Sequence, residues 1–161
     1  MSPSETDGVQ RPWSIPTELA DLLERPLVAF LATRRPDGTL QNNPMWFWFD
    51  GSVIEMSHTS DRQKFRNLMS DPSVSLCIPD PENPYRYVEV RGDLVDVRPD
   101  EGAAFHRSLR ERYGMDTSAI PDAAVRVVLT VRPTSVRGRA MKNPTVQGQA
   151  DDATPRNGDH A

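Results

Sequence analysis

The sequence predicts a mainly β domain of the α+β class, built as a small six-stranded antiparallel barrel with three short flanking helices. Six runs have the apolar or aromatic composition of strands, tight-turn signals separate the first three, and a glycine interrupts the longest. Strands that follow one another through tight turns pair antiparallel, and a glycine inside a long strand often marks a bulge that lets a sheet curl. These features favour an antiparallel barrel over a parallel sheet.

The two ends of the 161-residue chain differ from its middle in composition. Residues 1–12 contain only Met1 and Val9 as larger apolar groups, and residues 147–161 contain none. Segments of this kind cannot offset the entropy cost of ordering by burying apolar surface. We therefore predict a disordered N-terminal tail over 1–12, one folded domain over 13–146 and a disordered C-terminal tail over 147–161.

The first half of the domain has the pattern of one helix followed by three strands. Leucines recur at helical spacing between residues 15 and 24, and the turn signals Pro-Asp-Gly and Asp-Gly separate the runs that follow. Alternation along the second run places Phe47 and Phe49 in the core. The expected elements are a helix over 15–24 and strands over 27–33, 39–49 and 52–57.

The second half begins with a short helix that Ser60 or Asp61 caps and that ends at Ser70. The spacing of its apolar residues predicts a buried face made of Phe65, Leu68 and Met69. The remaining expected elements are strands over 73–79 and 85–99, the second interrupted at Gly92, a helix over 100–113 and a last strand over 124–131.

Composition argues against several classes of function. The net charge of -4 and the pI of about 5.4 disfavour nucleic acid and anionic membrane surfaces as partners. No run approaches the ~18 apolar residues of a membrane span, and no signal-peptide stretch is present, so we expect a cytoplasmic protein. The single cysteine, Cys77, and the three histidines lack the spacing of a metal site, so we expect no metal.

One dense polar cluster, residues 57–67, lies where a strand passes into a helix. Hydroxyl groups, the amides of the first helical turn, and the cationic groups of Arg62 and Lys64 could together hold a phosphate. A solvated, positively charged helix face would have the same residues, and composition alone favours that alternative. Met45 and Trp46 on the preceding aromatic strand shift the balance, because they could lie against a planar ring.

The segments LATRRPDGTLQNNPMWFWFDG, SHTSDRQKFRNLMSDPSVSL and YVEVRGDLVDV resemble, in this order, the pyridoxamine 5'-phosphate oxidase-like split-barrel superfamily. They are most similar to its actinobacterial flavin/deazaflavin oxidoreductase branch. The likeness runs from about Leu27 to Gly138, and its most specific part is Arg-x-Lys-x-x-Asn-Leu at 62–68 followed by Asp-Pro-x-Val-x-Leu at 71–76. The chain lacks the C-terminal arginine-rich motif of true pyridoxamine-phosphate oxidases, so vitamin B6 oxidation is not expected.

The resemblance implies an FMN-binding type of split barrel that forms a homodimer with its site at the interface. By this resemblance Arg62 and Lys64 bind the cofactor phosphate with help from Ser57 and Thr59, the strand before them lines the ring, and the partner contributes tyrosines. The implied cofactor-binding residues are Asn43, Pro44, Met45, Trp46, Ser57, Thr59, Arg62, Lys64, Tyr85 and Tyr87.

The implied function is an oxidoreductase that transfers hydride from reduced coenzyme F420 to a small planar or conjugated acceptor. The cofactor carries the chemistry, so no catalytic side chain is predicted, although His58, Tyr85 or Tyr87 could donate a proton. Three alternatives stay open: an FMN-binding flavoprotein that uses the same phosphate-binding residues, a non-catalytic cofactor carrier, and a split barrel whose site has decayed.

Overall fold

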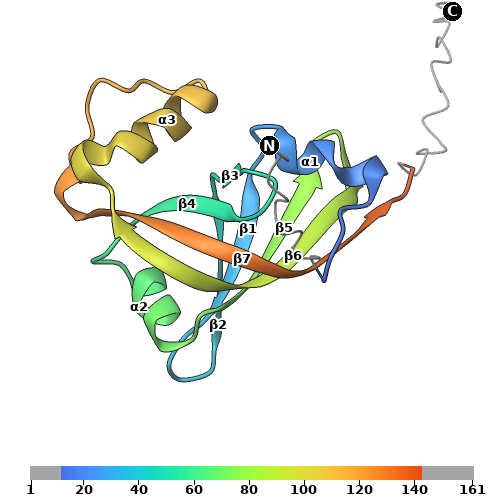
Figure 1. Cartoon of the computed structure of the whole chain (residues 1–161), viewed down its shortest axis with the longest axis horizontal. Helices are drawn as coiled ribbons and strands as arrows, with labels where there is room; N and C mark the ends of the chain where they lie inside the picture. Colours follow the sequence, from blue (N-terminus) through green and yellow to red (C-terminus); the bar gives the residue numbers. More distant parts are fainter. Residues whose placement is uncertain (1–11, 143–161) are drawn as a thin grey trace, which may run out of the picture.

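The computed structural model describes residues 12–142, whose strands form one antiparallel sheet of seven strands (Figure 1). In sheet order these are β2 (Leu40–Met45), β1 (Ala29–Arg34), β5 (Ser73–Asp80), β6 (Asn83–Pro99), β7 (Arg126–Ala140), β4 (Ile54–Thr59) and β3 (Trp48–Phe49). The helices are α1 (Asp21–Glu24), α2 (Gln63–Ser70) and α3 (Ala104–Arg112), with 3-10 turns η1 (Thr17–Leu19), η2 (Glu101–Ala103) and η3 (Ala123–Val125). The mainly β, antiparallel class is confirmed, but the prediction of six strands is wrong.

The seventh strand exists because the aromatic segment 39–49 is two strands, not one. β2 pairs with β1, whereas β3 pairs with β4 at the other edge of the sheet. Only Trp46 and Phe47 separate the two strands, so the sheet must curl until its outer edges are neighbours. The described residues form no ladder between β2 and β4, and we call the gap between these strands the seam.

β6 and β7 form the long central pair of the sheet. A register shift between Arg91 and Gly92 confirms the predicted irregularity in β6. A Cβ atom on Gly92 would come within 2.3 Å of the carbonyl oxygen of Arg132, so a larger residue could not fit without moving the backbone. The last strand continues to Ala140, well past its predicted end at 131, because its second half pairs with the first half of β6.

The core fills the inside of the curled sheet and is closed at one end by η1 and α1, which replace the single predicted helix over 15–24. Phe47 is fully buried and Phe49 packs against the core half-buried, as predicted. The residues with no exposed surface include Leu22, Ala29, Leu31, Phe47, Ile54, Met56, Leu76, Ile78, Val88, Val128, Leu129 and Val131.

The buried face of α2 differs from the predicted one. Lys64 and Asn67 are buried beside Leu68, whereas Met69 is 51% exposed and Phe65 is only half-buried. Burial of a polar side chain lowers the free energy of unfolding unless the side chain finds a hydrogen-bond or ionic partner, so helices rarely have such residues on their buried face. This face of α2 therefore points to the candidate site.

The helix predicted over 100–113 is shorter, and a left-handed backbone at its start explains the difference. Gly102 and Ala103 have φ angles of 61° and 55°, which separate η2 from α3. The carboxylate of Asp100 then accepts hydrogen bonds from the backbone amides of Phe105 and His106, both at 2.9 Å. These bonds satisfy amides that the helix itself leaves unpaired and fix where α3 begins.

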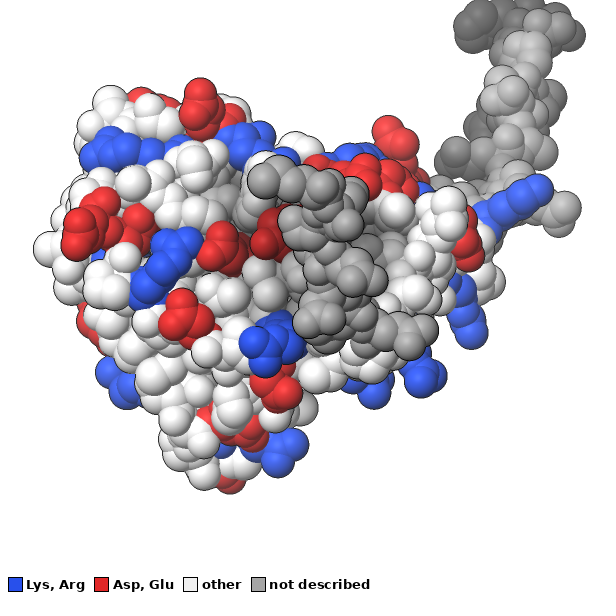
Figure 2. All heavy atoms as spheres, viewed as in Figure 1, with Lys and Arg blue, Asp and Glu red and all other residues white. Residues whose placement is uncertain are grey.

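The predicted tails lie outside the described residues, apart from Pro12, as do residues 143–146 of the predicted domain. Among residues 12–142, none of the helices combines the length and apolarity that crossing a bilayer would need. Acidic and basic side chains are intermixed over the face of the molecule in Figure 2.

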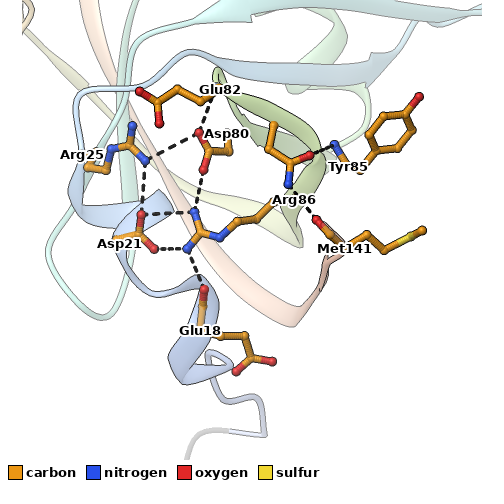
Figure 3. A network of polar contacts seen from close by, with 9 residues as sticks. Glu18, Asp21, Arg25, Asp80, Glu82, Tyr85, Arg86 and Met141 are labelled. Carbon is orange, nitrogen blue, oxygen red and sulfur yellow. Dashed lines mark hydrogen bonds and ion pairs between the residues drawn. The ribbon is translucent and has the colours of Figure 1, made fainter. Parts of the chain in front are cut away.

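A network of charged groups fastens α1 to the turn between β5 and β6 (Figure 3). The guanidinium of Arg86 donates hydrogen bonds to the carboxylates of Asp21 and Asp80 and to the backbone carbonyl of Glu18. Arg25 pairs with the same two carboxylates at 3.2 Å and 3.8 Å. The hydrogen bond from Arg86 holds the pKa of Asp21 below its ordinary range. The pKa of Asp80 is lowered chiefly by a hydrogen bond from the backbone amide of Glu82, and the guanidinium groups of Arg86 and Arg25 add to the effect.

Candidate functional site

A cavity of about 230 Å³ lies at the seam, between the end of β2 and one face of α3. Its lining is mainly apolar, and among residues 12–142 only two polar side chains, from β4 and α3, reach it. The lining residues are Val28, Pro44, Met45, Trp46, Ser57, His106 and Leu109. Four of the ten predicted site residues are therefore brought together here: Pro44, Met45, Trp46 and Ser57.

Trp46 is held in a fixed orientation by a stack of rings. The centroid of its ring lies 4.9 Å from the ring centroid of Tyr113 and 6.5 Å from that of His106, and the interplanar angle is 18° in both pairs. The Tyr113 hydroxyl donates to the carbonyl of Leu27 at 2.6 Å and accepts from the amide of Phe47 at 3.2 Å. The ring of Trp46 thus forms a flat wall of the cavity.

Lys64 reaches from α2 across to the end of β2. Its Nζ atom lies 3.0 Å from the Sδ atom of Met45, and the residue is only 5% exposed. Burial, together with the positive charge of Arg62, lowers the pKa of Lys64 to about 8. A thioether is a weak acceptor, so this buried ammonium would gain much from a nearby anion.

Asn67 lies one helical turn after Lys64 and organises a polar network. Its side-chain amide donates to Thr33 at 3.1 Å and to Gln41 at 2.9 Å, and it accepts from Gln63 at 2.8 Å. Gln41 in turn donates to Asn43 at 3.0 Å. The predicted site residue Asn43 therefore belongs to this network and does not line the cavity. The alternation of Gln41 and Asn43 along one strand face was the signal that could have revealed the network.

Ser57 and Thr59 lie on one side of β4, next to a cation that sequence reasoning missed. Arg126, directly opposite Thr59 on β7, donates to the Ser57 hydroxyl at 3.2 Å and binds Asp122 through two hydrogen bonds of 2.9 Å and 2.8 Å. The Thr59 hydroxyl is buried without a hydrogen-bond partner among the described residues. Arg126 could be identified only once the pairing of β4 with β7 was known.

The electrostatic environment of His58, on the other side of β4, shows that this region is positive. Burial lowers the pKa of His58 to about 4, and the charges of Lys64, Arg62 and Arg126 add to the effect. Arg62 is exposed at the start of α2, and its guanidinium forms no hydrogen bond or ion pair with a described residue. Asp122 pairs with Arg126, so Lys64 and Arg62 are the cations near this strand end that form no ion pair with a described carboxylate, and they favour an anionic ligand.

Tyr85 and Tyr87 are not part of this arrangement within one chain. They flank Arg86 near the start of β6, and neither lines the cavity. Tyr85 is 50% exposed, and its backbone amide donates a hydrogen bond to the side chain of Asn83 at 3.2 Å. The assignment of both tyrosines to a partner's site stays a prediction.

The arrangement suits a ligand that joins a phosphate to a planar ring. A phosphate would supply an acceptor to the buried Thr59 hydroxyl and an anionic partner to Lys64, and Met45 and Trp46 would receive the ring. Within residues 12–142, no three or more His, Cys, Asp or Glu side chains gather as metal ligands would. The site has the features of a cofactor-binding site.

Comparisons with known proteins agree with this geometry. The family profile described as pyridoxamine 5'-phosphate oxidase matches residues 15–140, whereas no curated protein matches the chain. A solved structure of an F420 reductase is 48% identical, with a TM-score of 0.74 over 76% of this chain and 98% of that one. The conserved hypothetical protein Rv2991 from Mycobacterium tuberculosis is 25% identical, with a TM-score of 0.64 over 84% of this chain and 94% of that one. General Stress Protein 26 from Bacillus anthracis, at 16% identity, 76% and 91% coverage and a TM-score of 0.58, shares the fold alone.

Proposed function

The chain belongs to the pyridoxamine 5'-phosphate oxidase family, and within it we propose an oxidoreductase that uses reduced coenzyme F420 to reduce a small planar or conjugated acceptor. The observation that carries the proposal is the buried Lys64 ammonium, which among the described residues has only the thioether of Met45 as its hydrogen-bond partner. The Thr59 hydroxyl, buried without a partner among the same residues, and the flat ring of Trp46 support it. The 48% identity to an F420 reductase supports F420 over FMN.

The proposal gives each group at the site a physical task. Arg62 and Lys64 bind the cofactor phosphate as charged hydrogen-bond donors, and the Thr59 hydroxyl adds a neutral one. Met45 and Trp46 pack against the ring and keep water from it. When bound, the reduced cofactor supplies the hydride, so no nucleophilic side chain is required. The neutral ring of His58 does not line the cavity, and we assign it no proton transfer.

We also propose that the site is completed in a homodimer. The cavity, at about 230 Å³, is smaller than the ~300–1,000 Å³ usual for such ligands, which supports a second chain forming the missing wall. An apolar groove of about 390 Å³ adjoins the site cavity through their shared residue Val28, and Phe30 in this groove is 42% exposed. Sedimentation analysis of the wild type and of Phe30→Glu tests this, since a dimer should dissociate in the variant.

Titration of the purified chain with F420 and, separately, with FMN tests the choice of cofactor. We expect F420 fluorescence to be quenched on binding, and reduced F420 to be consumed when quinone, nitroaromatic or tetrapyrrole acceptors are added. Tight binding of FMN without any response to F420 would replace the proposal by the FMN-dependent alternative. Binding of F420 without turnover of any acceptor would instead favour a cofactor carrier.

A further inference from the structure

The α3 wall of the cavity contains a polar residue that the proposed function leaves unused. His106 and Leu109 lie one turn apart on α3, and both line the cavity. His106 is 9% exposed, and its Nδ1 atom is buried without a hydrogen-bond partner among the described residues. Buried polar groups in folded proteins are almost always paired, so an unpaired ring nitrogen at a cavity points to a ligand.

The surroundings of His106 keep its ring uncharged. The pKa of His106 is lowered mainly by burial of the ring. The positive charges of Arg126 and Arg110 lower it further, whereas the negative charges of Asp122 and Asp100 raise it. A neutral imidazole has one N–H donor and one acceptor nitrogen. Ser57, the other polar side chain at the cavity, already accepts a hydrogen bond from Arg126. His106 is therefore the polar group of this cavity that is best able to bind a new partner.

We propose that His106 selects the electron acceptor by donating a hydrogen bond from its ring to a carbonyl group on a planar, otherwise apolar compound. The inference rests on the proposed function, because it places the acceptor in the same cavity. The walls formed by Val28 and Leu109 suit an apolar ring and disfavour a charged one, which would lose its hydration there. The ring of His106 lies nearly parallel to that of Trp46, so a flat acceptor stacked along His106 would lie parallel to a cofactor ring packed on Trp46.

Binding of two compounds with one ring frame tests the proposal without any turnover. 1,4-Naphthoquinone has carbonyl groups and naphthalene has none, and their affinities can be measured from quenching of tryptophan fluorescence. We expect wild type to prefer the quinone, and His106→Leu to lose about 3- to 10-fold of that preference, as for one net hydrogen bond. Ser108→Ala, an exposed change on the same helix, serves as the control and should leave both affinities unchanged.

Two amide variants keep the test valid if the His106→Leu chain does not fold. An Asn side chain places its N–H near the Nδ1 position of histidine and a Gln side chain near Nε2, so His106→Asn should retain the preference for the quinone and His106→Gln should not. The proposal is overturned if wild type binds neither compound or shows no preference. It is equally overturned if His106→Leu weakens both compounds alike, or if His106→Asn does not keep the preference. Failure of F420 and FMN to bind would refute the proposed function while leaving the quinone measurement interpretable.

Discussion

The Nζ atom of Lys64 lies 3.0 Å from the Sδ atom of Met45, so a lysine of α2 and a methionine of β2 meet at the seam. The sequence indicated these two residues for different reasons, one as a phosphate ligand and the other as a ring contact. A thioether cannot compensate for the hydration that a buried ammonium loses. We therefore expect the Lys64 ammonium to exchange this contact for an anion when the cofactor binds.

Removal of the two motif cations should weaken cofactor binding strongly. Charged hydrogen bonds contribute roughly 1.5–3 kcal/mol each, so Arg62→Ala and Lys64→Ala should each lower affinity by about 10- to 150-fold. The double variant should lose more than either single one. Equilibrium titration of F420 fluorescence measures all three.

Arg34→Ala is the matched control for these variants. Arg34 pairs with Asp71, just past the other end of α2, at 3.7 Å, and both side chains are partly exposed. Its removal changes the net charge equally but leaves the site intact, so affinity should stay within about twofold. Equal losses in Arg34→Ala and Lys64→Ala would show that only overall charge matters.

Cofactor affinity should fall as the pH rises through the pKa of Lys64. That pKa is lowered to about 8 in the free protein, so Lys64 is charged below this pH and loses its proton above it. An anion binds the charged form, and above pH 8 binding must therefore be accompanied by proton uptake. Titrations between pH 6.5 and 9.5 should show this dependence, and Lys64→Arg should remove it, because arginine stays charged. An unchanged pH profile in Lys64→Arg would contradict the assignment.

Burial of neutral His58 should make the fold sensitive to mild acid. The pKa is about 4 in the folded chain and 6.5 ordinarily, so the unfolded chain binds the proton first as the pH falls. The contribution of His58 to the free energy of unfolding is therefore fully present above pH 6.5. It is lost progressively toward pH 4, which lowers the free energy of unfolding by about 1–3 kcal/mol. Chemical denaturation at pH 7 and pH 4.5 measures the difference. His58→Gln should reduce it, while the lowered pKa of His106 leaves a smaller residual slope of the same sign.

Loss of Arg86 should loosen the attachment of α1. Four acceptor atoms, on Asp21, Asp80 and Glu18, lose their donor in Arg86→Ala, and we expect the free energy of unfolding to fall by about 1–3 kcal/mol. Thermal and urea denaturation report this change. Arg91→Ala, which breaks an exposed pair with Glu89, should cost less than about 1 kcal/mol. Similar effects of the two variants would rule out the network as a fastening for α1.

The sequence predicted those parts of the fold that depend on local patterns. Turn signals, alternation and the glycine of β6 indicated the strands and the bulge at Gly92. The break at Trp46 and Phe47 could not be predicted, because it depends on long-range pairing. The residues before it pair with β1 at one edge of the sheet, and those after it pair with β4 at the other. The second half of β7 was missed for a similar reason, since its pairing with β6 is long-range.

The site was predictable where neighbours in sequence are also neighbours in space. Ser57 and Thr59 lie on β4 and Lys64 lies on α2, the helix that follows it directly in the chain. Arg126 and His106 reach the same region through β7 and α3, so only the folded chain reveals them. The exposed Met69 shows the limit of apolar spacing, because the site requires the inward face of α2 to be polar.

The place of β7 between β6 and β4 has a consequence for how the chain folds during synthesis. β4 is made early, yet among the described residues it pairs only with β7 and with β3, and β3 supplies two residue pairs. β4 therefore cannot join the rest of the sheet until β7 has been translated, and the nascent chain keeps apolar strand edges exposed until then. A chain stopped before residue 126 lacks the strand that joins the two halves, so this domain assembles only after nearly all of it has been translated.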